Sequence, residues 1–205
     1  METRNLGADG IAHLTIDGNP KPVCPGSADT LKPSWLHVEG VGGYLLPTGG
    51  TLHAKCQDRT GRWTDINHRE RMDPSEHTRT WLTLWFEHGV QPVDATYAYV
   101  LLPGATTEQT ACWLATTGLR IVTNSAQAQA VQLHDPADGA HITLANFFTD
   151  NSPAAGGISF DRQASVILRQ RDDQRETAVA HPPNVNGAEE FTAEFDWTAS
   201  AVEHR

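Results

Sequence analysis

The 205-residue chain lacks several features that would assign it quickly to a class of protein. It has no run of about 18 apolar residues, which a membrane-spanning helix would need, so we expect no membrane partner. Its opening residues, METRNLGADG, lack the apolar stretch of a secretory signal peptide. Basic residues are also few, because 15 Lys and Arg stand against 25 Asp and Glu, for a formal net charge of −10. That balance argues against a nucleic-acid partner, since binding phosphates needs a clustered basic surface.

Motifs that carry chemistry are equally scarce. The cysteines Cys24, Cys56 and Cys112 are widely spaced, which predicts neither a disulfide framework nor a zinc knuckle. The ten histidines include no HxH or HxxxH arrangement, so we predict no metal site and no cofactor. The chain has no GxSxG elbow, no Walker loop and no GxGxxG after a strand. Because these motifs are absent, they identify no catalytic residue.

What the sequence does contain is alternation of apolar and polar residues, which is typical of β-strands. In GIAHLTIDG, Ala12, Leu14 and Ile16 share one face, and the turn residues Asp17-Gly18-Asn19-Pro20 follow. Short strands of this kind recur along the chain, which predicts an all-β, antiparallel β-sandwich. Asn124-Ser125 separates two sets of strands, so we expect a domain boundary near Ala126, with one set over residues 1–125 and the other over residues 126–205.

Local signals add three further expectations. Turn residues at Pro47–Gly50 and at Asp58–Gly61 predict successive antiparallel hairpins. The segment YAYVLLP predicts a strand that carries Tyr97 and Tyr99 on one face and ends at Pro103. One short helix is expected, capped by Thr106 or Thr107, with Gln109 three residues after Thr106 as a capping-box partner. The helix would have an apolar stripe and end at Gly118; the stripe consists of Ala111, Leu114 and Ala115.

Three groups of residues are candidates for function, each with a structural alternative. His88, Tyr97 and Tyr99 could act as base and acid, or could pack together at a turn. The alternating charges of residues 59–79 could form a solvated face, or their arginines could bind carboxylates. The tryptophans could stack on sugar rings, although most of them should lie in the core of a sandwich; they are Trp35, Trp63, Trp81, Trp85, Trp113 and Trp197.

Five sequence blocks, in this order and spacing, resemble the β region of polysaccharide lyase family 8, which includes hyaluronate, chondroitin AC and xanthan lyases. The blocks are Gly43-Tyr44, Trp63 with Ile66-Asn67, His88-Gly89 with Pro92, Tyr97-Ala98-Tyr99 with Pro103, and Asn124 with Gln129-Ala130-Val131. The resemblance extends over nearly the whole chain. It implies the later part of the family's central supersandwich, followed by its small C-terminal sandwich.

The resemblance also implies an activity and a location for the parent proteins. Lyases of this family cleave uronate-containing polysaccharides outside the cell by β-elimination, with an anionic polysaccharide as substrate. Their catalytic Asn, His, Tyr and Arg lie on an N-terminal helical toroid, which no part of this sequence matches. We therefore carry over no catalytic residue, and His88, Tyr97 and Tyr99 match scaffold positions of the family.

Two interpretations follow from the resemblance. In the first, these residues are the β-sandwich portion of a polysaccharide lyase, which meets its substrate through a missing or separate catalytic domain and is inactive alone. In the second, the chain is a free-standing carbohydrate-binding or structural module that keeps the lyase scaffold.

Overall fold

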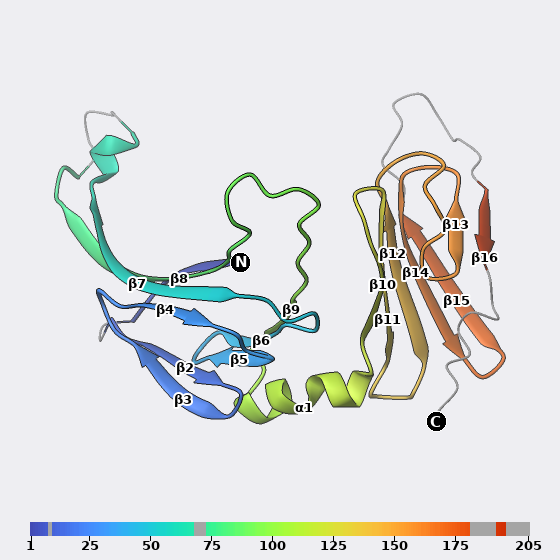
Figure 1. The fold of residues 1–205 in the computed structure, drawn as a ribbon, viewed down its shortest axis with the longest axis horizontal. Coiled ribbons are helices and arrows are strands. Elements are labelled where there is room, and N and C mark those ends of the chain that lie inside the picture. The colour runs from blue at the N-terminus through green and yellow to red at the C-terminus, as the bar shows by residue number, and fades with distance from the viewer. Residues whose placement is uncertain (8–9, 68–72, 181–191, 196–205) are drawn as a thin grey trace. The chain divides into compact units, whose positions relative to one another are not determined.

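The computed structural model describes residues 1–7, 10–67, 73–180 and 192–195. Within them the chain forms strands, one α-helix and one short 3-10 helix (Figure 1). Two compact units are present, Met1–Cys112 and Trp113–Arg205. No helix among the described residues is long and apolar enough to cross a membrane.

The first unit is built from two antiparallel sheets. The strands are β1 (Glu2–Asn5), β2 (Ala12–Ile16), β3 (Asn19–Val23), β4 (Ala28–Leu31), β5 (Trp35–Val38), β6 (Gly42–Leu45), β7 (Leu52–Gly61), β8 (His77–Phe86) and β9 (Val100–Pro103). One sheet has the order β1-β8-β7-β4 and the other the order β3-β2-β5-β6-β9. Buried side chains from both sheets, such as Leu14, Leu36 and Leu84, form one hydrophobic core. The all-β, antiparallel sandwich expected from the sequence is confirmed.

The first hairpin shows how the sequence specifies its local structure. Ala12 and Leu14 point into the core, while His13 between them is exposed. Asp17 and Gly18 both have positive φ angles, 46° and 84°, as the two central residues of a tight hairpin turn require. This turn pairs Ile16 with Asn19, so β2 and β3 are joined as the turn residues predicted.

Two expected hairpin turns are wrong. Residues 47–50 do not join a hairpin, because β6 pairs with β5 and β9 while β7 lies in the other sheet. Residues 58–61 continue β7 and pair with residues 77–80 of β8. There the turn-forming tendency of Asp58 yields to cross-strand bonding, since the Thr80 hydroxyl donates to its carboxylate at 2.6 Å.

Helix α1 (Thr107–Thr117) begins as expected but buries a different face. The Thr106 N–H donates to Gln109 Oε1 at 2.8 Å and the Gln109 N–H donates to Thr106 Oγ1 at 3.2 Å, so the capping box is confirmed. The apolar stripe is wrong, because Ala111 and Ala115 are exposed and Thr110 and Thr117 are buried. A buried threonine is tolerated here since the Thr110 hydroxyl donates to the Thr106 carbonyl, four residues earlier.

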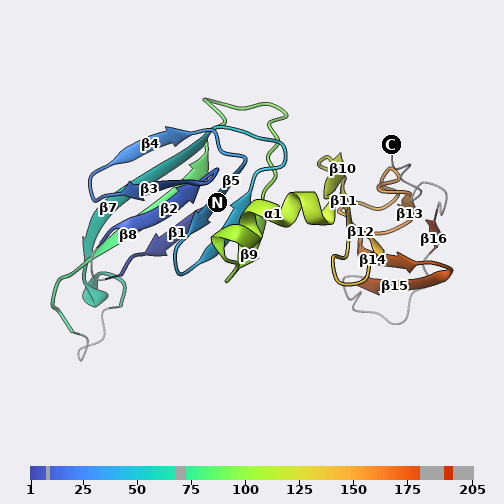
Figure 2. The ribbon, with the colours of Figure 1, turned by 90° about the horizontal axis from the view of Figure 1, so that it is seen from below.

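The second unit has one five-stranded sheet and a two-stranded partner. The strands are β10 (Arg120–Asn124), β11 (Ala128–His134), β12 (His141–Phe147), β13 (Ile158–Phe160), β14 (Ala164–Arg171), β15 (Gln174–Ala180) and β16 (Ala193–Phe195). The large sheet has the order β10-β11-β12-β14-β15, and β13 pairs with β16 (Figure 2). Ile158 and Phe160 of β13 pack against the alanines and Phe147 of the large sheet, which forms the second core. The domain boundary expected after Ser125 falls between β10 and β11, which pair in this sheet, whereas the compact units divide after Cys112.

Candidate functional site

Four rings meet where β8 ends, and we refer to Phe86, His88, Tyr97 and Tyr99 as the aromatic cluster. The Phe86 ring lies 5.6 Å from the Tyr97 ring and 6.4 Å from the Tyr99 ring, measured between centroids. The His88 ring lies 5.7 Å from Tyr97. The two tyrosine rings are 6.4 Å apart and almost parallel, at 13°. These separations are those of aromatic pairs that stabilise one another.

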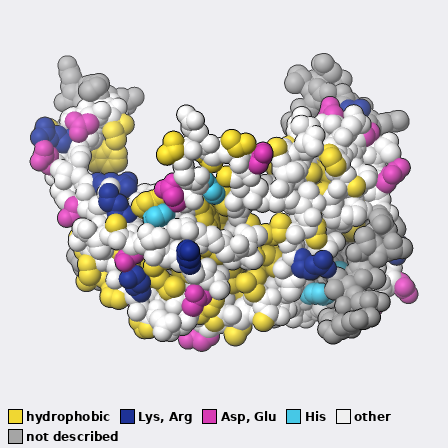
Figure 3. Space-filling model, viewed as in Figure 1, with side chains coloured by type: hydrophobic (Ala, Val, Ile, Leu, Met, Phe, Trp, Pro, Cys, Tyr) yellow, Lys and Arg dark blue, Asp and Glu magenta, His cyan; other side chains and the backbone are white. Residues whose placement is uncertain are grey.

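The aromatic cluster lies at the surface of the first unit. Tyr97 is 57% exposed and Tyr99 is 37% exposed, and the same loop holds Val90 and Val93, both of them almost fully exposed. Figure 3 shows hydrophobic side chains over this loop, which follows β8 in Figure 1. The expected strand through Tyr97 is wrong in its start, because β9 begins at Val100. The rings nevertheless pack together, and they do so in contact with solvent.

The charged residues of 59–79 that the structure describes lie along β7, β8 and the segment between them. Arg62 forms an ion pair with Glu76, and the Arg59 guanidinium donates to Thr83 at 3.1 Å. Arg59 also lies over the Trp81 ring, 5.8 Å from its centroid. These contacts are those of a solvated strand surface. His68, Arg69 and Arg71 lie outside the described residues.

The tryptophans differ from the core positions expected of them. Trp63 is 56% exposed. Trp35, Trp81, Trp85 and Trp113 are half-buried, and Trp85 stacks on His53 with 5.1 Å between ring centroids. Trp197 lies outside the described residues. Trp35, Trp81 and Trp85 lie on strands next to the buried Leu36, Leu82 and Leu84, so they point to the opposite face, away from the core.

A metal centre is not evident in the part of the chain that the structure describes. No group of three or more His, Cys, Asp or Glu side chains there is close enough to hold an ion. Cys24 and Cys112 are exposed and Cys56 is buried, and none of these three forms a disulfide. Burial raises the pKa of the Cys56 thiol, and the nearby Asp58 carboxylate raises this pKa further. A raised pKa disfavours the reactive thiolate, so Cys56 is a core residue.

The chain thus contains two antiparallel β-sandwich units in succession, and the first carries a surface cluster of aromatic rings. These features define a β-sandwich protein, and comparison with family models identifies its family. The super-sandwich domain of polysaccharide lyase family 8 matches residues 1–112, and the C-terminal β-sandwich domain of the same family matches residues 120–188. The chain therefore belongs to polysaccharide lyase family 8.

Individual relatives agree with this assignment. A hyaluronate lyase of Thermasporomyces composti is 36% identical over 185 residues, which cover 89% of this chain and 23% of the relative. A xanthan lyase of Bacillus sp. (strain GL1) is 34% identical over 91% of this chain and 20% of the relative. The solved structure of a Paenibacillus xanthan lyase superposes with a TM-score of 0.77 at 32% identity, covering 87% of this chain and 18% of that chain.

A chondroitin AC lyase of Streptomyces coelicolor A3, solved in complex with chondroitin sulphate, superposes with a TM-score of 0.66 at 32% identity. This match covers 91% of our chain and 22% of that enzyme. The chain thus spans about a fifth of the length of the relatives that it matches. Its resemblance to the family's β region, recognised from five sequence blocks, is confirmed.

Proposed function

We propose that these residues form the β-sandwich portion of a lyase that cleaves a uronate-containing polysaccharide by β-elimination. The observation that carries the proposal is the match of both units, in order, to the super-sandwich and C-terminal sandwich domains of one lyase family. Polysaccharides of this kind are too large to enter a cell intact, so we place the activity outside the cell.

The elimination itself needs groups beyond this scaffold. A base must remove the proton beside the carboxylate, an acid must protonate the leaving oxygen, and a further group must stabilise the enolate-like state. The family resemblance assigns these roles to a helical toroid. The described helical content of this chain is α1 and the 3-10 helix η1 (Trp63–Asp65). We therefore infer that the 205 residues do not perform the elimination alone.

The first prediction tests this inference directly. Purified protein of these 205 residues is expected to release no unsaturated uronide from hyaluronan, chondroitin or xanthan, as followed by ultraviolet absorbance. A full-length lyase of the family, assayed in parallel with each substrate, serves as the positive control. Product formation that grows in proportion to the amount of this protein, and persists after repurification, would show that the chain holds its own catalytic groups.

A second candidate function is contact with the polysaccharide through the aromatic cluster. Exposed rings can stack on the apolar face of a sugar, and the near-parallel Tyr97 and Tyr99 offer two such surfaces. With a net charge of −10 the chain repels an anionic glycan at long range. We therefore propose weak binding that depends on the two tyrosines.

The second prediction concerns this binding. Titration of the chain with hyaluronan oligosaccharides by calorimetry or NMR should give a Kd of about a millimolar, equivalent to about −4 kcal/mol. Combined Tyr97→Ala and Tyr99→Ala replacement should abolish the saturable NMR shifts of Phe86 and His88, the remaining rings of the aromatic cluster, because it removes both stacking surfaces. Val93→Ala is the matched control, since Val93 is 84% exposed on the same loop. An equal loss of oligosaccharide binding in the Val93→Ala control would contradict the proposed mode of contact. Submicromolar affinity in the parent chain would contradict it as well.

A further inference from the structure

The core-facing side of the large sheet in the second unit changes from apolar to polar along its strands. Cross-strand partners Ala130, Ala145 and Val166 are buried in the core. Two residues further along the same face, Gln132 pairs with Thr143. The next row contains the pair His134 and His141. Since side chains of a strand alternate between faces, these polar groups point to the same side as the core.

This polar end of the sheet lines a pocket of about 670 Å³, a volume in the range of small-molecule sites. The lining is largely apolar, with side chains such as Leu133 and Ile142. Its polar side chains are Thr116, Arg120 at the start of β10, Gln132, Asp135, Thr143 and the two histidines. The histidine rings are half-buried and lie 4.2 Å apart between centroids. The last turn of α1 also lines the pocket, where Gly118, with φ +58°, approaches His134 closely. A Cβ at Gly118 would lie 3.4 Å from Nδ1 of that ring.

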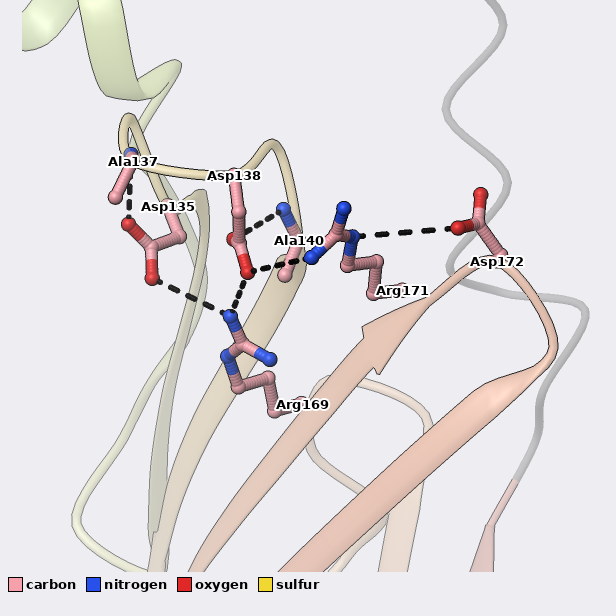
Figure 4. A network of polar contacts seen from close by, with 7 residues as sticks. All are labelled: Asp135, Ala137, Asp138, Ala140, Arg169, Arg171 and Asp172. Atoms are coloured by element: carbon pink, nitrogen blue, oxygen red, sulfur yellow. Dashed lines mark hydrogen bonds and ion pairs between the residues drawn. The ribbon is translucent and has the colours of Figure 1, made fainter.

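The pocket lining includes one acidic residue, whose carboxylate already lies beside an arginine side chain. Asp135, in the turn between β11 and β12, accepts a bond from the Ala137 N–H at 2.9 Å and lies 3.6 Å from Arg169 (Figure 4). Asp138 in the same turn forms an ion pair with Arg169. The Ala140 N–H and then this arginine hold the pKa of Asp138 below its usual range. The turn carboxylates thus bond to β14, and Arg120 supplies a positive charge to the pocket.

We propose that this pocket binds the carboxylate of a sugar, that is, a hexuronate unit. Arg120 would hold the carboxylate, because a guanidinium matches two carboxylate oxygens in its fork. The imidazoles of His134 and His141 offer N–H donors in either protonation state. The last carbonyl groups of a helix have no intrahelical donor, so the end of α1 can accept bonds from sugar hydroxyls. This combination favours an acidic sugar over a neutral sugar or a bare anion.

The site is independent of the elimination proposed above. It lies in the second unit, whereas the aromatic cluster lies in the first, and its occupation would add a second contact with an acidic polysaccharide. Two weak contacts on one chain raise the apparent affinity for a long polymer through effective concentration. Failure of uronate binding would leave the lyase assignment intact, and failure of that assignment would leave this pocket testable.

The experiment uses the full 205-residue chain and D-glucuronate as the probe, followed by NMR shifts of the histidine ring protons. Saturable binding at one site is expected, with D-glucose and acetate each binding at least about tenfold more weakly, since each lacks one half of the recognised chemistry. Arg120→Gln should weaken glucuronate binding by about tenfold or more. Arg79→Gln, on β8 of the first unit, is the matched control and should bind as the parent does.

His134→Gln provides a second variant in case Arg120→Gln does not fold, as judged by circular dichroism. It is expected to weaken binding while retaining the parent spectrum. The proposal is overturned if glucuronate produces no saturable shift. It is also overturned if glucose or acetate binds as well as glucuronate, or if folded variants at Arg120 and His134 bind as tightly as Arg79→Gln.

Discussion

Replacement of Gly42 by alanine is expected to destabilise the Met1–Cys112 unit by about 3 kcal/mol or more. Gly42 starts β6, a strand that lies between β5 and β9 in its sheet. A Cβ at this position would lie 2.2 Å from the Leu102 carbonyl oxygen and 2.8 Å from the Gly104 nitrogen. Both are backbone atoms of the neighbouring strand and its end, so they cannot move aside as a side chain could. The residue also has φ +137°, a conformation that alanine rarely adopts.

Urea unfolding, followed by tryptophan fluorescence and circular dichroism, measures the change in the free energy of unfolding. Gly61→Ala is the matched control, because Gly61 ends β7 at the surface and an added Cβ would meet no atom within 4 Å. The control should change the stability by less than about 0.5 kcal/mol. Equal stability of the two variants would show that β6 and β9 can separate without cost.

The stability of the first unit is expected to fall above about pH 10 because of Tyr44. Tyr44 is 1% exposed, and its hydroxyl donates to the Glu2 carboxylate at 2.6 Å. Burial first, and then this hydrogen bond, raise the pKa of Tyr44 well above its ordinary value of 10. The folded state therefore retains a proton that the unfolded chain releases. The resulting stabilisation is complete below pH 10 and is lost as the pH rises toward the folded pKa, at up to about 1.4 kcal/mol per pH unit.

Tyr44→Phe isolates this contribution. At neutral pH the variant should be less stable by about 2 kcal/mol, because the Glu2 carboxylate loses a donor. Between about pH 10 and about pH 12 the difference between parent and variant should shrink, since phenylalanine has no proton to release. A constant difference between parent and Tyr44→Phe across this range would contradict a raised pKa at Tyr44.

Sequence patterns correctly predicted the structural elements that depend only on residues close together in the chain. The alternation in Ala12–Ile16 and the turn at Asp17-Gly18 depend on neighbouring residues, and both are present in the structure. The capping box of Thr106 and Gln109 depends on four consecutive residues and is likewise present. In contrast, Asp58–Gly61 has the composition of a turn but continues a strand, because ten residues of β8 pair along β7. Pairing over that length outweighs the turn preference of a few residues.

The candidate sites show the same difference between features set by neighbouring residues and features set by tertiary contacts. Proximity in sequence brought His88, Tyr97 and Tyr99 together as candidates. Phe86, the last residue of β8, was not among them, and the structure places its ring 5.6 Å from Tyr97 and 6.4 Å from Tyr99. The pocket in the second unit was not predicted. Its histidines are seven residues apart in a hairpin whose register makes them neighbours, and Arg120 lines the same pocket from a third strand.

By itself, the sequence determined an antiparallel β-sandwich of polysaccharide lyase family 8, with its acidic balance, its capped helix and its first hairpin. These depend on the order of residue types, on short-range turn and capping geometry, and on blocks that the family shares. Only the tertiary structure decided that β6 and β7 belong to different sheets, that Thr110 and Thr117 are the buried face of α1, and that Arg120, His134 and His141 line one pocket at the end of the large sheet in the second unit. Each of these features depends on contacts between segments that are far apart in the chain. For example, Thr110 packs so closely on Gly43 that a Cβ there would lie 2.1 Å from the Thr110 hydroxyl oxygen.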